Sequence, residues 1–268
     1  MNKNDLKLYA ITDRQWLHKA RLSEHVKLAI EGGATMIQIR DKDILSTDSD
    51  AGLKDEYNEA LEIKRICHEH KVPLIINDNV QFAIDIDADG VHLGQDDMNP
   101  AEARKLLGAD KIIGVTAKTV EQAKKAQVDG ADYLGSGAVF GSTTKLNAKP
   151  MTKELLREIT AAVDIPVVAI GGINADNAVT LEGTGIAGIA VVGAIFASAD
   201  IKLQPGNSQK YATKFSRKER KYAYSTYNCG KRFKRWRRRA GRFKDHACKR
   251  CVWRECHHST HGTKHHGS

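Results

Sequence analysis

The sequence predicts an α/β protein built on a single (β/α)8 barrel, and two observations carry this prediction. Short apolar runs recur along residues 1–205, and charge-studded segments with helical spacing of apolar residues separate them. There are eight such runs, which is the number of strands that closes a TIM barrel of ~250 residues. A doubly wound open sheet is the structural alternative.

The expected strands are bounded by glycine and polar residues, and they cover residues 8–12, 36–40, 73–78, 90–94, 112–117, 133–140, 167–173 and 189–196. The segments between them supply the crossovers that parallel strands require. We expect these helices at residues 22–31, 56–70, 100–107, 119–128, 152–162 and 175–181.

Charge divides the chain into two unequal regions. The 268 residues carry a formal net charge of +9, but residues 206–268 hold 19 basic and 3 acidic residues, which leaves −7 for residues 1–205. Only Cys67 of the five cysteines lies in the first region. We therefore predict a barrel domain over residues 1–205 and a disordered or poorly folded basic extension, without an independent fold, over residues 206–268.

The extension allows two interpretations. The basic run at residues 231–239 includes aromatic residues, a pattern typical of nucleic-acid binding, and Cys248, Cys251 and Cys256 with nearby histidines suggest zinc ligands. Alternatively, allowed codons for residues 226–266, read one base later, encode without a stop a peptide that resembles the N-terminus of hydroxymethylpyrimidine (phosphate) kinase. We favour this hypothesis of an out-of-frame fragment and do not expect a nucleic-acid partner.

No segment reaches the ~20 consecutive apolar residues of a membrane span, and the N-terminus has no apolar signal region. These observations predict a cytoplasmic protein without a membrane partner. Assembly into a homo-oligomer is left open.

Three polar side chains alternate where the second expected strand ends. Because side chains alternate across a strand, Gln38, Arg40 and Lys42 should point to the same side, toward the mouth of the barrel. Arg40 and Lys42 suit a polyanion, and Gln38 offers both a donor and an acceptor to the edge of a heterocycle. The alternative is a solvated charge cluster, since Asp41 and Asp43 lie beside them.

Carboxylates follow the next two strands. Asn77 and Asp78 close the third strand, and Asp97 follows the fourth. Neighbouring strand ends bring these oxygens close to one another, and a few hard oxygen ligands are what Mg²⁺ bound to a substrate diphosphate uses. As alternatives, Asp97 caps the helix that begins near Pro100, and Asp78 is a turn residue.

Hydroxyl groups follow the sixth expected strand, and glycines lie at the end of the seventh and on the eighth. Because glycine lets a phosphate approach the main chain, these residues suggest the phosphate site that many barrels form after strands 7 and 8: Ser142, Thr143, Thr144, Lys145, Gly171, Gly172, Val192 and Gly193. Glycines needed only for a tight turn are the alternative. Thr116 adds one hydroxyl or simply packs, and we expect His92 to be a satisfied core or rim histidine rather than a catalyst.

With these residues in place, residues 1–205 resemble the thiamine-phosphate synthase family. The resemblance runs from residues 8–13 through residues 193–195, and the polar clusters agree in order and spacing. It implies a Mg²⁺-dependent transferase of thiamine biosynthesis. Such an enzyme joins 4-amino-2-methyl-5-hydroxymethylpyrimidine diphosphate to 4-methyl-5-(2-phosphoethyl)thiazole and releases pyrophosphate.

The resemblance also implies a role for each matching residue. Gln38 would contact the pyrimidine, and Asp78 and Asp97 would hold the metal. The diphosphate would be bound by Arg40, Lys42, Asn77 and Lys145, and the thiazole phosphate by Ser142, Thr144, Gly172, Val192 and Gly193. Lys145, Arg40, Lys42 and Thr116 are the candidate catalytic residues. Two residues depart from the family pattern: Thr116, where the family commonly has serine, and Gly193, where a serine would donate to the phosphate.

Two other functions remain alternatives. A thiazole tautomerase barrel shares the fold and phosphate site but does not need the diphosphate and metal groups that this sequence contains. A nucleic-acid-binding protein acting through the extension would bind in a salt-dependent manner.

Overall fold

The computed structural model describes residues 1–17, 20–40, 50–141 and 150–197, without the side chains of residues 50–53. All of them belong to one compact unit, Met1–Lys218. The predicted basic extension lies outside the described residues. Within the described ranges, no helix is long and apolar enough to cross a membrane.

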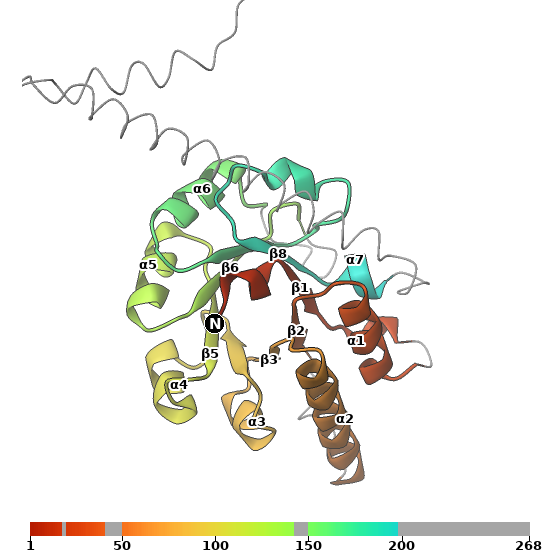
Figure 1. Cartoon of the computed structure of the whole chain (residues 1–268). Coiled ribbons are helices and arrows are strands. Elements are labelled where there is room, and N and C mark those ends of the chain that lie inside the picture. The colour runs from red at the N-terminus through yellow and green to blue at the C-terminus, as the bar shows by residue number, and fades with distance from the viewer. Residues whose placement is uncertain (18–19, 41–49, 142–149, 198–268) are drawn as a thin grey trace, which may run out of the picture. The chain divides into compact units, whose positions relative to one another are not determined.

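Eight parallel strands form a closed barrel in sequence order, and helices surround them (Figure 1). This arrangement confirms the predicted fold class. The strands are β1 Leu8–Ile11, β2 Met36–Ile39, β3 Leu74–Asn77, β4 Gly90–Leu93, β5 Ile112–Thr116, β6 Tyr133–Gly137, β7 Val167–Ile170 and β8 Gly188–Val191.

The α-helices are α1 Leu22–Glu31, α2 Asp50–Glu69, α3 Val80–Asp85, α4 Pro100–Leu107, α5 Val120–Val128, α6 Lys153–Ala161 and α7 Gly193–Phe196; the 3-10 helices are η1 Lys3–Leu6, η2 Arg14–Trp16 and η3 Ala178–Leu181. Helices α1 and α4 have the expected bounds, whereas α2 begins six residues earlier than expected. Helix α3 was not predicted from the sequence.

The expected ends of several strands were wrong. The eighth apolar run contains β8 and then α7, and Gly193 begins that helix rather than lying on the strand. Periodicity cannot separate two short buried elements that follow each other, because Val191 and Phe196 are both buried. Likewise, only the end of the expected helix at residues 175–181 is helical, as η3.

Two apolar layers hold the barrel together. The larger lies between the strands and the helices, and the smaller fills the barrel interior with side chains that include Met36, Ile75, Ile112 and Val168. Leu6 of η1 belongs to the interior layer and is fully buried. Because η1 contacts β1 and β8, it closes the end of the barrel where the strands begin.

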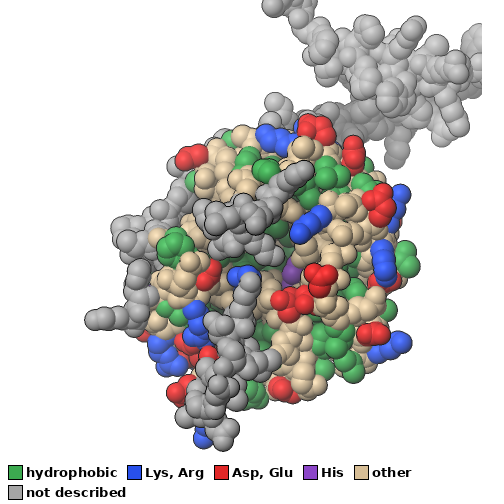
Figure 2. All heavy atoms as spheres, turned by 180° about the vertical axis from the view of Figure 1, so that it is seen from behind, with side chains coloured by type: hydrophobic (Ala, Val, Ile, Leu, Met, Phe, Trp, Pro, Cys, Tyr) green, Lys and Arg blue, Asp and Glu red, His purple; other side chains and the backbone are tan. Residues whose placement is uncertain are grey.

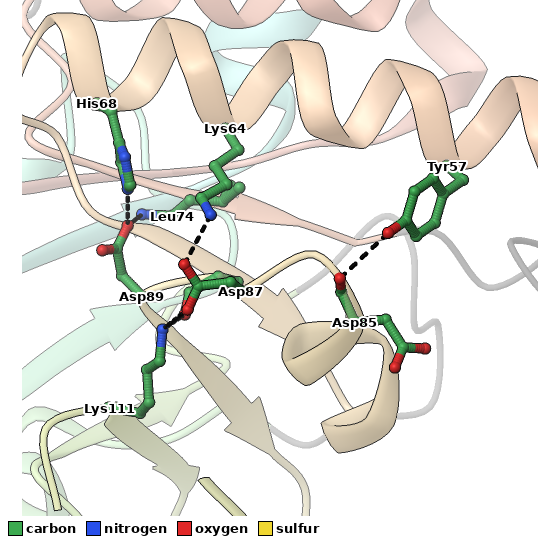
Figure 3. A network of polar contacts seen from close by, with 9 residues as sticks. Tyr57, Lys64, His68, Leu74, Asp85, Asp87, Asp89 and Lys111 are labelled. Carbon is green, nitrogen blue, oxygen red and sulfur yellow. Dashed lines mark hydrogen bonds and ion pairs between the residues drawn. The ribbon is translucent and has the colours of Figure 1, made fainter. Parts of the chain in front are cut away.

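Side chains that precede β2, β4 and β6 bind the backbone near the starts of β1, β3 and β5. Asp89 precedes β4, and its Oδ2 accepts a hydrogen bond of 2.8 Å from the backbone N–H of Leu74, the first residue of β3. Figure 3 shows this carboxylate between Leu74 and His68, whose Nε2 lies 3.4 Å from Oδ2. Thr35 likewise accepts from the N–H of the first residue of β1 at 2.9 Å, and Asp132 accepts from that of the second residue of β5 at 2.8 Å.

Asp89→Ala is expected to lower the free energy of unfolding by about 1–3 kcal/mol, because it leaves the buried N–H of Leu74 without this acceptor. Urea unfolding of the purified chain measures the loss. Asp87→Asn is the matched control, since Asp87 is exposed and pairs with Lys64 and Lys111 at the surface, where such pairs contribute only about 0–1 kcal/mol. Equal losses in the two variants would contradict the proposed role of Asp89.

Candidate active site

The polar residues predicted from the second to fifth strands meet where those strands end. The register pairs Ile11 with Gln38, and Asn77 with His92, on neighbouring strands. Thr116 is the last residue of β5 and lies beside Gly135 of β6. Figure 2 shows acidic and basic side chains on either side of a histidine near the middle of one face of the molecule.

A continuous line of hydrogen bonds crosses the barrel interior, and we call it the interior polar chain. Gln38 Nε2 donates to the Tyr9 hydroxyl at 2.6 Å, and this hydroxyl lies 2.9 Å from that of Tyr133. The Tyr133 hydroxyl lies 3.0 Å from His92 Nδ1, and His92 Nε2 lies 3.0 Å from Thr116 Oγ1. The interior polar chain therefore joins two predicted substrate-binding residues, Gln38 and Thr116.

Burial controls the ionisation of the two tyrosines and the histidine in the interior polar chain. It raises the pKa of both tyrosine hydroxyls well above their ordinary value, so that both stay protonated. Burial also lowers the pKa of His92 to about 4, although the charge of Asp97 opposes this shift. His92 is therefore neutral near pH 7 with a partner on each ring nitrogen, which confirms the prediction of a satisfied histidine.

The two candidate metal ligands face each other. The carboxyl of Asp97 lies within hydrogen-bonding reach of that of Asp78. Burial and the neighbouring Asp97 raise the pKa of Asp78 to about 6, whereas Asn77 and the charge of Arg40 lower it. Asn77 Nδ2 donates to Asp78 Oδ2 at 2.6 Å. Residues from the ends of three different strands and the loops after them thus form one compact charged cluster.

Backbone geometry supports each carboxylate. Asp78 has a φ of 61°, in the left-handed region that side chains other than glycine rarely adopt, and its N–H donates to the His92 carbonyl at 2.9 Å. The N–H of Gly94 donates to Asp97 Oδ2 at 2.6 Å. Asp97 does not cap the following helix, because Asn99 is the N-cap of α4. The capping alternative was therefore wrong, whereas Asp78 does lie in a turn.

The glycines predicted for phosphate binding follow β7 and β8. Gly171 and Gly172 have φ of 100° and 63°, and a Cβ on Gly172 would lie 2.9 Å from the carbonyl oxygens of Phe140 and Gly141. The turn itself therefore requires glycine, as the alternative interpretation held. Val192 connects β8 to α7, and Gly193 is the first residue of that helix. Their role toward a phosphate stays a prediction.

Five residues predicted for the site lie outside the described residues: Lys42, Ser142, Thr143, Thr144 and Lys145. Among the described residues, no group of three or more His, Cys, Asp or Glu side chains is arranged to hold a metal ion. The pair of Asp78 and Asp97 would thus need further ligands, such as substrate oxygens or water.

Two residues of the site, Tyr9 and Tyr133, were not predicted from the sequence. Each is an aromatic residue in an apolar strand, which normally indicates packing alone. Gly114 offers a weak signal, because a Cβ there would lie 2.1 Å from Cζ of Tyr133, so that the tyrosine ring occupies the space of the missing side chain.

The fold and the site define an α/β barrel with a charged cluster at the carboxyl ends of its strands, which is where enzymes of this architecture have their active sites. Residues 8–195 match the family model described as thiamine monophosphate synthase. Thiamine-phosphate synthase of Ruminiclostridium cellulolyticum is 49% identical over 201 residues, which are 75% of this chain and 92% of that protein. That of Methanobrevibacter smithii is 43% identical over 210 residues, 78% and 97% of the two chains.

A solved structure agrees with these relatives. The thiamine phosphate pyrophosphorylase of Pyrococcus furiosus superposes with a TM-score of 0.69 at 38% identity, covering 79% of this chain and 98% of that one. The chain therefore belongs to the thiamine monophosphate synthase family. It is a transferase of thiamine biosynthesis that forms thiamine phosphate. The comparisons support this prediction and neither the tautomerase nor the nucleic-acid-binding alternative.

Proposed function

We propose that this site binds the pyrimidine diphosphate and the thiazole phosphate together, and that it transfers the pyrimidine to the thiazole nitrogen with release of pyrophosphate. The single observation that carries this proposal is the cluster of Asp78, Asp97 and Arg40 beside the interior polar chain. The charged cluster suits a metal-bound diphosphate, and the interior polar chain suits an uncharged heterocycle.

Asp78 and Asp97 would hold Mg²⁺ together with diphosphate oxygens. Burial raises the pKa of Asp78, and repulsion between the two neighbouring carboxylates adds to this shift, because both are costly to ionise together. A divalent cation removes this repulsion and makes the ionised pair favourable. When bound, the metal would neutralise charge on the departing pyrophosphate.

Arg40 would bind the diphosphate beside this pair. Its backbone N–H donates to Thr12 Oγ1 at 3.0 Å, which holds the start of its loop against β1. Asn77, Lys42 and Lys145 are the further candidate diphosphate ligands. Cations here favour bond breaking, because negative charge grows on the leaving group as the carbon–oxygen bond lengthens.

Gln38 would recognise the aminopyrimidine. Its Nε2 already donates one hydrogen to Tyr9, so the second amide hydrogen and Oε1 remain to bind a ring nitrogen and an exocyclic amine. The thiazole phosphate would be bound by Ser142, Thr144, Gly172, Val192 and Gly193. The thiazole nitrogen would then attack the exocyclic carbon from which pyrophosphate departs.

His92 does not act as a nucleophile or base in this proposal, because both of its ring nitrogens are hydrogen-bonded within the barrel. The described residues instead orient the heterocycle and stabilise the leaving group. The transfer thus depends on departure of pyrophosphate and on capture of the resulting pyrimidine cation by the thiazole. No covalent bond between substrate and enzyme forms in this proposal.

The full-length chain should release pyrophosphate only when both substrates and Mg²⁺ are present. Arg40→Ala is expected to raise KM for the pyrimidine diphosphate about 10- to 100-fold, because charge-assisted hydrogen bonds are worth about 1.5–3 kcal/mol. The matched control is Arg65→Ala, since Arg65 is exposed on α2 and pairs with Glu69. A folded full-length chain that releases no pyrophosphate under these conditions would contradict the proposal.

A further inference from the structure

The interior polar chain has a direction that follows from the chemistry of its members. An amide nitrogen only donates, a hydroxyl has one hydrogen to donate, and a neutral imidazole has one donor and one acceptor nitrogen. Gln38 Nε2 donates to Tyr9, which leaves the Tyr9 hydrogen free for Tyr133. Tyr133 then donates to His92 Nδ1, and the remaining hydrogen on Nε2 is donated to Thr116.

The reverse direction leaves one group unsatisfied. If Thr116 donated to His92 Nε2, the hydrogen on Nδ1 would go to Tyr133 and that of Tyr133 to Tyr9. The Tyr9 hydroxyl would then accept two hydrogen bonds. Its own hydrogen would be buried, and neither of its two neighbours in the interior polar chain could accept it. Rotating the Gln38 amide so that Oε1 faces Tyr9 removes this conflict. The amide orientation therefore selects between the two directions.

We propose that the orientation of the Gln38 amide sets the tautomer of His92 and, through it, the direction of the Thr116 hydroxyl. With Nε2 of Gln38 turned inward, His92 carries its hydrogen on Nε2, and Thr116 accepts from it. The hydroxyl hydrogen of Thr116 then points to an acceptor on the bound substrate. Tyr9, Tyr133 and His92 are thus positioning residues that couple two substrate contacts.

The consequence for substrate selection rests on the proposed function. An aminopyrimidine that donates to Gln38 Oε1 favours the inward orientation of Nε2, and this same orientation makes Thr116 a donor. A heterocycle with an oxygen in place of the amine would favour the rotated amide and would turn Thr116 into an acceptor. Binding of the amine at Gln38 would therefore change the orientation of the Thr116 hydroxyl, at the other end of the interior polar chain.

Nitrogen-15 NMR of the full-length protein at neutral pH reads the tautomer without substrate. Because the chain has 11 histidines, the His92 signals are assigned by their loss in His92→Gln. We expect the Nε2–H tautomer in the wild type. Gln38→Glu should shift it toward Nδ1–H once the introduced carboxyl is ionised, because a carboxylate only accepts; since burial raises the pKa of a carboxyl at this position, this variant is measured at neutral and at alkaline pH. Tyr133→Phe removes the donor to Nδ1 and should give a mixture of tautomers. An Nδ1–H wild type, or no change in either variant, would overturn the inference.

Kinetics provide the second readout. Tyr133→Phe keeps the ring that fills the barrel interior but removes the hydroxyl that links the interior polar chain. We expect kcat/KM for the pyrimidine diphosphate to fall about 5- to 30-fold. Tyr57→Phe is the matched control, since its hydroxyl donates to the Asp85 carbonyl at 3.1 Å on the outer surface (Figure 3). An inactive wild type with the expected tautomers would contradict the proposed function alone, whereas an active wild type with unchanged tautomers would contradict only the coupling.

Discussion

Replacing Asp97 by asparagine is expected to lower kcat/KM for pyrophosphate release about 100- to 1000-fold, comparable to the loss of one group that stabilises charge in a transition state. Asparagine keeps the shape of the side chain and an oxygen to accept from Gly94 N–H, a hydrogen bond of 2.6 Å in the wild type. It removes the negative charge beside Asp78. Initial rates measured against Mg²⁺ concentration should show a higher requirement for the metal.

The stability of this variant separates a metal role from a structural one. Without bound metal, removing the carboxylate that raises the pKa of Asp78 relieves like-charge repulsion, so Asp97→Asn should unfold at the same or a higher urea concentration. Asp110→Asn changes an exposed carboxylate in the turn before β5 and is the matched control. An Asp97→Asn enzyme with wild-type rate and metal dependence would show that Asp97 does not ligate the metal.

Much of the barrel is predictable from the sequence because each strand is a short buried apolar run. Strand β4 begins at Gly90 and β5 at Ile112, as expected. The strand ends are less predictable, because the first polar residues after a strand continue its alternation and yet already belong to loops. Gly171 and Gly172 illustrate this: they were expected at the end of β7, but both take left-handed conformations after it.

The candidate site was predictable to a similar degree. Asp78 and Asp97 are polar residues directly after apolar runs, and the parallel barrel brings such positions together regardless of sequence separation. Tyr9 and Tyr133 were not predictable, because their hydroxyls meet across the barrel at 2.9 Å and no local pattern records a contact over 124 residues. The interior polar chain becomes visible only when the closed sheet sets the register of its strands.

The amino end of the barrel supports the site without contributing to its chemistry. Leu6 is fully buried in the interior layer, whose members include Tyr9 and Tyr133. Packing of η1 against this end therefore helps to hold both tyrosines at the separation that the interior polar chain requires. The tight contact at Gly188 makes this packing testable by a substitution far from the predicted substrate ligands.

Gly188→Ala is expected to lower the free energy of unfolding by about 3 kcal/mol or more, the upper range for overpacking of a filled core. Gly188 begins β8, and a Cβ there would lie 1.9 Å from the carbonyl oxygen of Leu6 and 2.7 Å from Cα of Lys7. Both contacts are with backbone, which cannot move aside as the end of a flexible side chain can. Either η1 or β8 must shift, and urea unfolding measures the cost.

Gly130→Ala distinguishes this steric effect from the general cost of replacing glycine. Apart from the adjacent residues, nothing lies within 4 Å of a Cβ at Gly130, which follows α5 with a φ of 91°, so the substitution carries the left-handed backbone cost of about 1–2 kcal/mol. Gly188→Ala should therefore lose clearly more stability than Gly130→Ala. Equal losses of unfolding free energy would mean that η1 can shift at little cost. The strands alone would then have to hold the interior polar chain in place.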